Sequence, residues 1–499
     1  MPLFLGLDIG TSGAKAIICD GDGVIIASAL AEYPIASPHP LWSEQHPADW
    51  WHGAQTAIST VVAQVDAAQI RGIGLTGQMH GAVFLDDANT VIRPALLWND
   101  QRTAAECAEI TQTVGADRLL AIAGNPALTG FQAPKILWVR NHEPQNYARI
   151  AHIVLPKDYI RFLLSDIYAA DVADGAGTLL MDITARDYSA EILNALAIPR
   201  HWLPKLAEGP AITGELTPAA AALLGLRAGI PIVAGGGDNA AAAIGTGIVK
   251  TGVVNSSIGT SGVVFAHSDR IALDPKGRLH TFCHSVPGAW HMMAVTLSAG
   301  GSFAWFRNML RQMGNHALSY DDLVAVAAPT PVGAEGLLFL PYLSGERTPH
   351  LDPLARGGFI GLTSRHTVGH MARAVLEGVT YSLRDGINIM HTLGVPTTDI
   401  RATGGGGKSA FWCQLQADIY AAPVSTLAAE EGPAYGAALL AGVGTGYFRD
   451  VDDAVQRCVR VAATFHPNPH AVAKHNDTYA VYRELYGHLA SDMHALARL

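Results

Sequence analysis

The sequence lacks the features that define several large classes of protein. No apolar run approaches the roughly 18 residues of a membrane-spanning helix, so we expect no membrane partner. Acidic residues outnumber lysine and arginine by 43 to 33, and the net charge of −10 argues against nucleic acid as a main partner. The five cysteines are odd in number and show no Cys-x-x-Cys spacing, which favours a reducing cytosol without a disulfide framework or a zinc site. No basic leader precedes the first strand pattern, and we expect a cytoplasmic protein.

Two common catalytic signatures are also absent. The Gly-x-Ser-x-Gly elbow of serine hydrolases does not occur. The glycine run 404–407, followed by Lys408 and Ser409, lacks the four-residue gap of a Walker-type phosphate loop. A strained turn between a strand and a helix would need only one or two glycines. A run of four therefore favours a surface on which a flat nucleobase or ribose lies at a helix N-terminus.

Length and periodicity predict an α/β protein of two large domains. A chain of 499 residues is too long for one hydrophobic core, and only 15% of the residues are charged. Strand-like runs alternate with helix-like stretches in both halves, and no low-complexity linker separates them. The expected strands include residues 3–7, 14–19, 24–29, 70–75, 232–234, 290–295, 336–342 and 401–403, and the expected helices include 48–65, 297–310, 368–393 and 410–419. We place the boundary near residues 245–250, which gives domains 1–247 and 248–499.

One pentapeptide occurs twice, half a chain apart. Residues 9–13 and residues 258–262 both read Ile-Gly-Thr-Ser-Gly, each between two short apolar runs. This pattern predicts two β-hairpins whose tips expose backbone N–H groups and hydroxyls. Such a tip can hold a phosphate, and two of them suggest related domains that grip one polyphosphate from opposite sides. The alternative is two unrelated tight turns, because glycine, serine and threonine are common turn residues.

Asp8 and Lys15 flank the first of these turns. A carboxylate beside a phosphate-binding turn makes chemical sense when a cation bridges the two, and Mg²⁺ is usually held by one or two carboxylates, waters and phosphates. The alternative for Asp8 is an Asx-turn that caps the hairpin. Lys15 either adds positive charge to the phosphate site or is a solvated strand residue.

Asp238 is the strongest catalytic candidate. Three glycines precede it, so a ligand can approach the backbone, and Asn239 can hydrogen-bond a polar substrate. An aspartate in this position could accept a proton from a substrate hydroxyl while a phosphoryl group arrives. Capping of a helix N-terminus is the alternative for this turn. Met79, His80 and Trp98 follow strands and could line a small polar pocket, although a lone loop histidine is more often structural.

These motifs resemble those of the FGGY carbohydrate kinases, a family within the actin-like ATPase superfamily with the ribonuclease H-like fold. The resemblance covers about residues 3–450 and is strongest to the branch that acts on D-xylulose. It rests on segments 8–13 (DIGTSG), 77–81 (GQMHG), 97–100 (LWND), 235–239 (GGGDN), 257–262 (SIGTSG), 342–350 (YLSGERTPH) and 404–407 (GGGG). One departure is Gln132, where the family pattern has Pro, Ser or Thr; we expect it to affect packing only.

The resemblance implies the substrates and the roles of the candidate residues. The family transfers the γ-phosphoryl group of ATP, with Mg²⁺, to a sugar or polyol in a cleft between two domains. Asp238 would be the catalytic base, and Asp8 would be catalytic through its support of magnesium-bound ATP. The ATP-binding residues would be Thr11, Ser12, Lys15, Gly259, Thr260, Ser261, Gly405 and Gly406. The sugar-binding residues would be Met79, His80, Trp98, Asp238 and Asn239.

Three further points stay open at this level. Met79-His80 matches the loop of the kinases that act on D-xylulose, whereas another sugar or polyol (ribulose, xylitol or gluconate) is the first alternative. An actin-like chaperone or filament protein that uses ATP as a switch is the second, but it would need no small polar pocket. A homodimer is common in the family.

Overall fold

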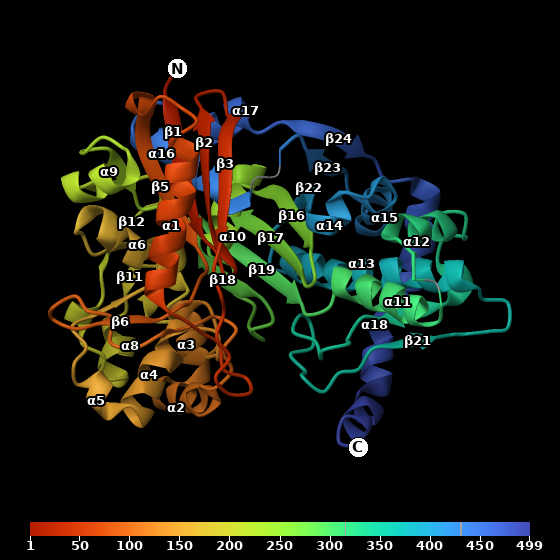
Figure 1. The fold of residues 1–499 in the computed structure, drawn as a ribbon. Coiled ribbons are helices and arrows are strands. Elements are labelled where there is room, and N and C mark those ends of the chain that lie inside the picture. Colours follow the sequence, from red (N-terminus) through yellow and green to blue (C-terminus); the bar gives the residue numbers. More distant parts are fainter. Residues whose placement is uncertain (315, 430–431) are drawn as a thin grey trace.

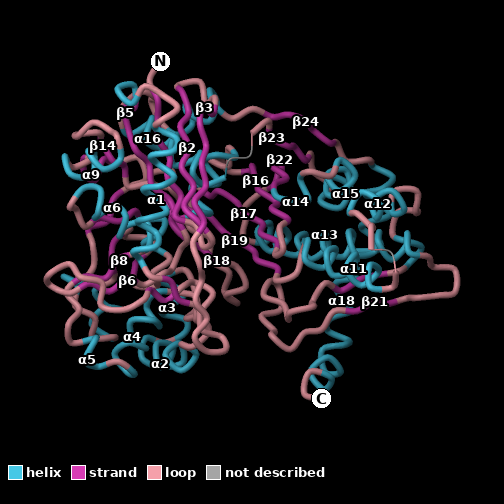
Figure 2. Tube along the Cα trace, viewed as in Figure 1, coloured by secondary structure: helices cyan, strands magenta, loops and turns pink. Residues whose placement is uncertain are grey.

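The computed structural model describes residues 1–314, 316–429 and 432–499, and it contains two large mixed β-sheets, each flanked by helices (Figures 1 and 2). The first sheet is formed by the N-terminal half and the second by the C-terminal half. The expectation of an α/β chain with two sheet-based domains is thus confirmed. None of the helices in the described ranges is long and apolar enough to cross a bilayer.

The first sheet has the strand order β13-β14-β5-β1-β2-β3, with β15 paired to β5. Its strands are β1 (Leu3–Ile9), β2 (Gly13–Asp20), β3 (Ile25–Glu32), β5 (Ile70–Gly77), β13 (Ile212–Glu215), β14 (Pro231–Val233) and β15 (Gly236–Gly237). β1 and β2 form the predicted antiparallel hairpin, and β5 runs parallel to β1. β1 is almost wholly buried, as its apolar sequence predicts. The loops after β1, β5 and β15 therefore leave the sheet at one edge.

The second sheet has the order β18-β19-β17-β16-β22-β23-β24. Its strands are β16 (Gly252–Ile258), β17 (Gly262–Ser268), β18 (His280–Cys283), β19 (Trp290–Thr296), β22 (Thr397–Thr403), β23 (Val424–Leu427) and β24 (Val461–Phe465). β16 and β17 form the second predicted hairpin, and β22 runs parallel to β16. The repeated pentapeptide thus lies at equivalent hairpin tips in both sheets.

Helices cover both sheets, and a largely helical lobe is inserted in the first half, at the lower left of Figure 1. The helices of the first half are α1 (Pro47–Val62), α2 (Ala104–Val114), α3 (Ala116–Ala123), α4 (Gln132–His142), α5 (Pro144–Tyr147), α6 (Pro156–Ser165), α7 (Val172–Ala176), α8 (Ala190–Ala195), α9 (Pro218–Leu224) and α10 (Asp238–Thr246). Those of the second half are α11 (Gly300–Gln312), α12 (Tyr320–Ala327), α13 (Val368–Thr392), α14 (Gly404–Gly407), α15 (Ala410–Tyr420), α16 (Gly432–Gly444), α17 (Val451–Cys458) and α18 (Pro469–Leu496).

Short strand pairs complete the fold. They are β4 (Glu44–Gln45) with β7 (Ala95–Leu96), β6 (Val83–Leu85) with β8 (His152–Val154), β9 (Ala169–Asp171) with β12 (Lys205–Ala207), β10 (Met181–Asp182) with β11 (Asp187–Tyr188), and β20 (Leu338–Leu340) with β21 (Gly358–Ile360). The lobe and the edge of the second sheet share one hydrophobic core, which includes Phe131, Phe282 and Met293. Most of this lobe and α18 lie outside the segments whose structure was predicted from the sequence.

Helices α10 and α16 pack closely where the two halves meet. α16 belongs to the second half by sequence but lies against β1 and β5 of the first sheet (Figure 1). Glycine makes this approach possible, because a Cβ on Gly74 would lie 1.8 Å from the carbonyl oxygen of Ala437, and one on Gly436 would lie 1.8 Å from that of Ala241. The domain boundary at 247/248 stays a prediction.

Candidate active site

The first hairpin tip is held from within its own domain. The Tyr33 hydroxyl donates to the carbonyl of Gly10 at 2.6 Å, and Gln45 Nε2 donates to the carbonyl of Thr11 at 2.7 Å. The indole N–H of Trp98 donates to the Thr11 hydroxyl at 2.9 Å. The tip is therefore fixed, while the Ser12 side chain is exposed.

Asp8, at the end of β1, and Asp238, the first residue of α10, form an electrostatic pair. Burial raises the pKa of Asp8 to about 7, the charge of Asp238 acts in the same direction, and Lys15 opposes it from the facing position of β2. Burial also raises the pKa of Asp238 to about 6, against two hydrogen bonds from Asn239 at 2.7 and 2.9 Å. Asp8 Oδ1 is buried without a hydrogen-bond partner among the described residues. Two buried carboxylates with raised pKa values, one of them within electrostatic range of the other, are suited to a cation or to proton transfer.

One cavity of about 460 Å³ brings together all five of the predicted sugar-binding residues: Met79, His80, Trp98, Asp238 and Asn239. Met79 and His80 follow β5, and Asp238 and Asn239 follow β15 at the same edge of the first sheet, whereas Trp98 follows β7, which pairs with β4 in a separate two-stranded sheet. Ser261 of the second hairpin tip also lines this cavity. A pocket of this size suits a small polar molecule.

His80 is held in a strained backbone conformation that fixes its ring. Its φ of 67° is in the left-handed region, where a residue with a Cβ is disfavoured. Lys135 Nζ donates to the His80 carbonyl at 2.9 Å, and His80 Nδ1 lies 2.7 Å from the carbonyl oxygen of Gly177. Because a carbonyl only accepts, Nδ1 carries the proton and Nε2 is an acceptor. Burial, chiefly, lowers the pKa of His80 to about 3, so the ring is neutral at physiological pH.

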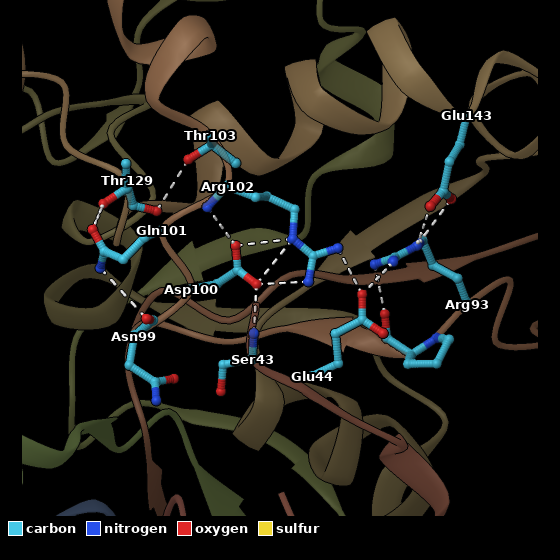
Figure 3. A network of polar contacts seen from close by, with 11 residues as sticks. Ser43, Glu44, Arg93, Asn99, Asp100, Gln101, Arg102, Thr103, Thr129 and Glu143 are labelled. Atoms are coloured by element: carbon cyan, nitrogen blue, oxygen red, sulfur yellow. Dashed lines mark hydrogen bonds and ion pairs between the residues drawn. The ribbon is translucent and has the colours of Figure 1, made fainter. Parts of the chain in front are cut away.

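The loop that carries Trp98 rests on a buried network of charges (Figure 3). Arg102 pairs with Asp100 at 2.6 Å and with Glu44 at 2.7 Å, and Arg93 also reaches Glu44 at 2.7 Å. Paired charges of this kind are held in one geometry by several hydrogen bonds at once. The network therefore fixes the loop, although Trp98 itself is 47% exposed.

Gln132 refines one expectation. We expected this departure from the family pattern to affect packing only. In the structure its buried side chain donates from Nε2 to the carbonyl of Gly81 at 2.9 Å. Gln132 is thus buried, as a packing position requires, and its hydrogen bond also anchors the loop that carries Met79 and His80.

Several residues that line this cavity were missed by the sequence reasoning. They include Phe131, His280, Phe282 and Arg347. Arg347 had a signal, since it lies in segment 342–350, but that segment received no role. Phe131 and the two residues of β18 had none, because only the packing of the inserted lobe on β18 brings them to the site.

The second hairpin tip lies between two cavities. Gly259 and Thr260 line a second cavity of about 590 Å³, together with Gly405 and Gly406, whereas Ser261 faces the first. Thr11, Ser12 and Lys15 line neither cavity. The tip is held by backbone bonds: Gly300 N donates to the carbonyl of Gly259 at 2.8 Å, and Gly301 N donates to that of Thr260 at 3.0 Å. A group bound in the second cavity would thus have one end at the tip that borders the first. The roles of these residues remain predictions.

Comparisons with known proteins give the family and the fold. Residues 3–245 match the N-terminal domain of the FGGY family of carbohydrate kinases, and residues 254–445 match its C-terminal domain. A xylulose kinase of Escherichia coli is 42% identical over 440 residues, which cover 88% of this chain and 89% of the relative. A xylulose kinase of Bacillus subtilis is 39% identical over 490 residues, covering 98% and 97%.

Solved structures give the same picture of the fold. The xylulose kinase of Rhodospirillum rubrum superposes with a TM-score of 0.93 at 31% identity, covering 99% of this chain and 100% of that one. A gluconate kinase of Lactobacillus acidophilus also reaches 0.93, at 26% identity, and 99% of each chain is covered. Equal scores for two sugar specificities mean that the fold alone does not identify the sugar.

Proposed function

Because the chain belongs to the FGGY family of carbohydrate kinases, with its actin-like ATPase fold and its use of ATP, we propose that it phosphorylates D-xylulose at the C5 hydroxyl. The observation that carries this proposal is the 460 Å³ cavity, which gathers Met79, His80, Trp98, Asp238 and Asn239 beside the second hairpin tip. The xylulose kinases at 39–42% identity support the same sugar. An ATP-switch chaperone is not favoured, because such a protein has no need of this cavity.

In the proposed reaction, Asp238 accepts the proton of the C5 hydroxyl. The hydroxyl oxygen forms a bond to the γ-phosphorus of ATP as the bond from that phosphorus to the β-phosphate oxygen breaks, and ADP leaves. The raised pKa of Asp238, about 6, makes it a better base than an ordinary aspartate, yet leaves it ionised at neutral pH. Asn239 holds the carboxylate through its two hydrogen bonds.

Asp8 fits a magnesium ion that accompanies ATP. Its Oδ1 is buried and accepts no hydrogen bond among the described residues, and its pKa is raised by burial and by Asp238 although Lys15 lowers it, so the site has room for a further cation. Mg²⁺ is usually held by one or two carboxylates together with waters and phosphate oxygens. When bound, Mg²⁺ would neutralise the charge of the phosphates. Asp8 would orient it, and Lys15 would add positive charge nearby.

The nucleotide would occupy the second cavity. Gly405 and Gly406 would carry the adenosine on bare backbone, and the amides and hydroxyls of Gly259, Thr260 and Ser261 would contact the phosphates. Thr11 and Ser12 would meet the phosphates from the first domain when the domains approach each other. We further propose a cytoplasmic location, in line with five free cysteines, and a possible homodimer.

A substrate panel tests the proposal. ADP release would be measured with Mg-ATP and each of D-xylulose, D-ribulose, L-ribulose, xylitol, gluconate and glycerol, and the product position would be read by NMR. We expect the highest kcat/KM for D-xylulose, with phosphate at C5. A higher value for another sugar would overturn the substrate, and ATP hydrolysis without a phosphosugar would overturn the transfer reaction.

A further inference from the structure

Arg347 reaches the sugar cavity from the second half of the chain and has no partner there. Among the described residues, its guanidinium makes no hydrogen bond or ion pair. The side chain is only partly exposed. A half-buried arginine normally binds acceptors, as buried Arg161 does with the carbonyls of Val233 and Ala234. Because the Arg347 guanidinium lines the proposed sugar cavity and has no acceptor in the part of the protein that the structure describes, we infer that the substrate provides the acceptor.

The backbone on both sides of Arg347 is fixed to the end of β19. The carboxylate of Glu346 accepts from Leu297 N at 3.0 Å and from the Arg347 backbone N at 2.7 Å. These hydrogen bonds go to the backbone and not to the Arg347 guanidinium. Thr348 N donates to the carbonyl of Val295 at 3.0 Å, and Val295 N donates to the Thr348 hydroxyl at 3.1 Å. Arg347 is therefore presented from a rigid segment rather than from a mobile loop.

Two neutral imidazoles share the cavity with this cation. His280 Nδ1 lies 2.8 Å from Asn125 Oδ1, whose own amide nitrogen donates to carbonyls, so Nδ1 donates and Nε2 is an acceptor, as in His80. The charge of Arg347 contributes to the lowered pKa of both histidines, whereas burial and Asn239 set the pKa of Asp238. Arg347, His80 and His280 line the same cavity as Asp238.

We propose that Arg347 determines specificity by donating hydrogen bonds to the C2 carbonyl of a ketose, so that ketoses are preferred to the corresponding polyols. This inference rests on the proposed function, in which C5 faces Asp238 and C2 is three carbons away. A carbonyl oxygen has two lone pairs and no proton, so it is a suitable acceptor for a guanidinium, which can only donate. The acceptor nitrogens of His80 and His280 suit the adjacent C1 and C3 hydroxyls. A C2 hydroxyl would carry a proton that the guanidinium cannot accept.

The test compares kcat/KM for D-xylulose and xylitol, which differ only at C2, in the wild type, in Arg347→Met, in Arg347→Lys and in Arg356→Met. Arg356 lies on the same loop and bonds only to loop carbonyls, so it controls for loop damage. We expect Arg347→Met to lower kcat/KM for D-xylulose about 10- to 100-fold, mainly through KM, and that for xylitol less than about threefold. Arg347→Lys should recover part of the loss, and Arg356→Met should change neither.

Other results would overturn the inference. An equal loss for both substrates would mean that Arg347 supports the fold or the transferred phosphoryl group. A wild type that prefers xylitol or gluconate would also overturn it, because the arginine would then bind a hydroxyl or a carboxylate. A wild type that prefers another ketose overturns only the proposed substrate, and the inference is then tested with that ketose and its polyol. Thermal shift with ADP checks that each variant is folded.

Discussion

The two sheets are copies of one six-stranded unit with different chemical content. The strand order β3-β2-β1-β5-β14-β13 corresponds to β19-β17-β16-β22-β23-β24, and every neighbouring pair keeps its parallel or antiparallel sense. Asp8 of β1 has Ser257 as its counterpart in β16. The first hairpin tip is braced by side chains, and the second by the backbone of Gly300 and Gly301.

This difference teaches how duplicated units can share one reaction. The first copy supplies ionisable side chains at its sheet edge, including Asp8 and Asp238. The second copy supplies bare backbone and hydroxyls at the equivalent edge, in a cavity that includes Gly405 and Gly406. In the proposed reaction, acid–base chemistry would come from the first copy and nucleotide recognition from the second. The following predictions test that division.

The largest effect is expected at Asp238. Asp238→Asn keeps the shape but cannot accept a proton, and we expect kcat to fall by about 10²- to 10⁴-fold. Rapid-quench or coupled assays at saturating D-xylulose measure it, with sugar binding followed by thermal shift. If the variant kept more than about a tenth of the wild-type kcat, Asp238 would not be the catalytic base.

Asp8 and its counterpart form a matched pair. We expect Asp8→Asn to lower kcat by about 10²-fold and to raise the Mg²⁺ concentration that gives half-maximal activity. Ser257→Ala should change each of these two quantities by less than about threefold. Equal losses in the two variants would contradict the division between the copies.

Asp8 should also show a cost in stability. Its folded-state pKa of about 7 exceeds that of an unfolded aspartate, so the unfolded state loses this proton first, and the cost to stability builds up between pH 4 and pH 7 and is full above pH 7. Asp8→Asn should therefore raise the free energy of unfolding by a few kcal/mol at pH 8, on the order of 1 kcal/mol per pKa unit, and leave it nearly unchanged at pH 3.5. Urea titrations at the two pH values measure this, and a pH-independent difference would refute it.

The packing of α16 on α10 gives a prediction outside the site. Gly436→Ala would insert a methyl group against the carbonyl of Ala241, and we expect a loss of about 1–3 kcal/mol in the free energy of unfolding. Gly487 in α18 has open space around it, and Gly487→Ala should instead stabilise by up to about 1 kcal/mol. Similar melting temperatures for both variants would count against this contact.

The pH profile should follow the ionised form of Asp238. Its pKa is raised to about 6, and only the carboxylate accepts a proton, so kcat/KM should fall about tenfold per pH unit well below pH 6. The residual activity of Asp238→Asn should lack this acid limb. A wild-type profile that stays flat down to pH 5 would rule out a base of this pKa.

The smallest effect is expected at Trp98. Trp98→Phe keeps an aromatic ring but removes the 2.9 Å hydrogen bond to the Thr11 hydroxyl, which joins the sugar cavity to the first hairpin tip. We expect kcat/KM to fall by about three- to tenfold, in keeping with one neutral hydrogen bond. Thr11→Val should give a similar loss, and the double variant should add little to either.

Much of the fold and part of the site were predictable because their signals are local. Both hairpins, the helix after Asp238 and the long helix α13 follow from periodicity and turn residues. Four of the five sugar-cavity residues follow β5 and β15, which end at one edge of the first sheet, whereas Trp98 follows β7 of a separate strand pair. Phe131 and His280 were not predictable, since they meet only through packing of the inserted lobe on β18. The same holds for Gln132, whose role depends on the distant carbonyl of Gly81.

The position of α16 determines when the first sheet can be completed during synthesis. Helix α16 covers a face of β1 and β5 that includes Gly74. Because Gly74 has no side chain, the backbone there is exposed to water until α16 packs against it. The ribosome therefore has to deliver the chain as far as Gly444 before the earliest strands are sealed. A fragment that ends near residue 247 would lack α16 and would leave this face of β1 and β5 exposed to water.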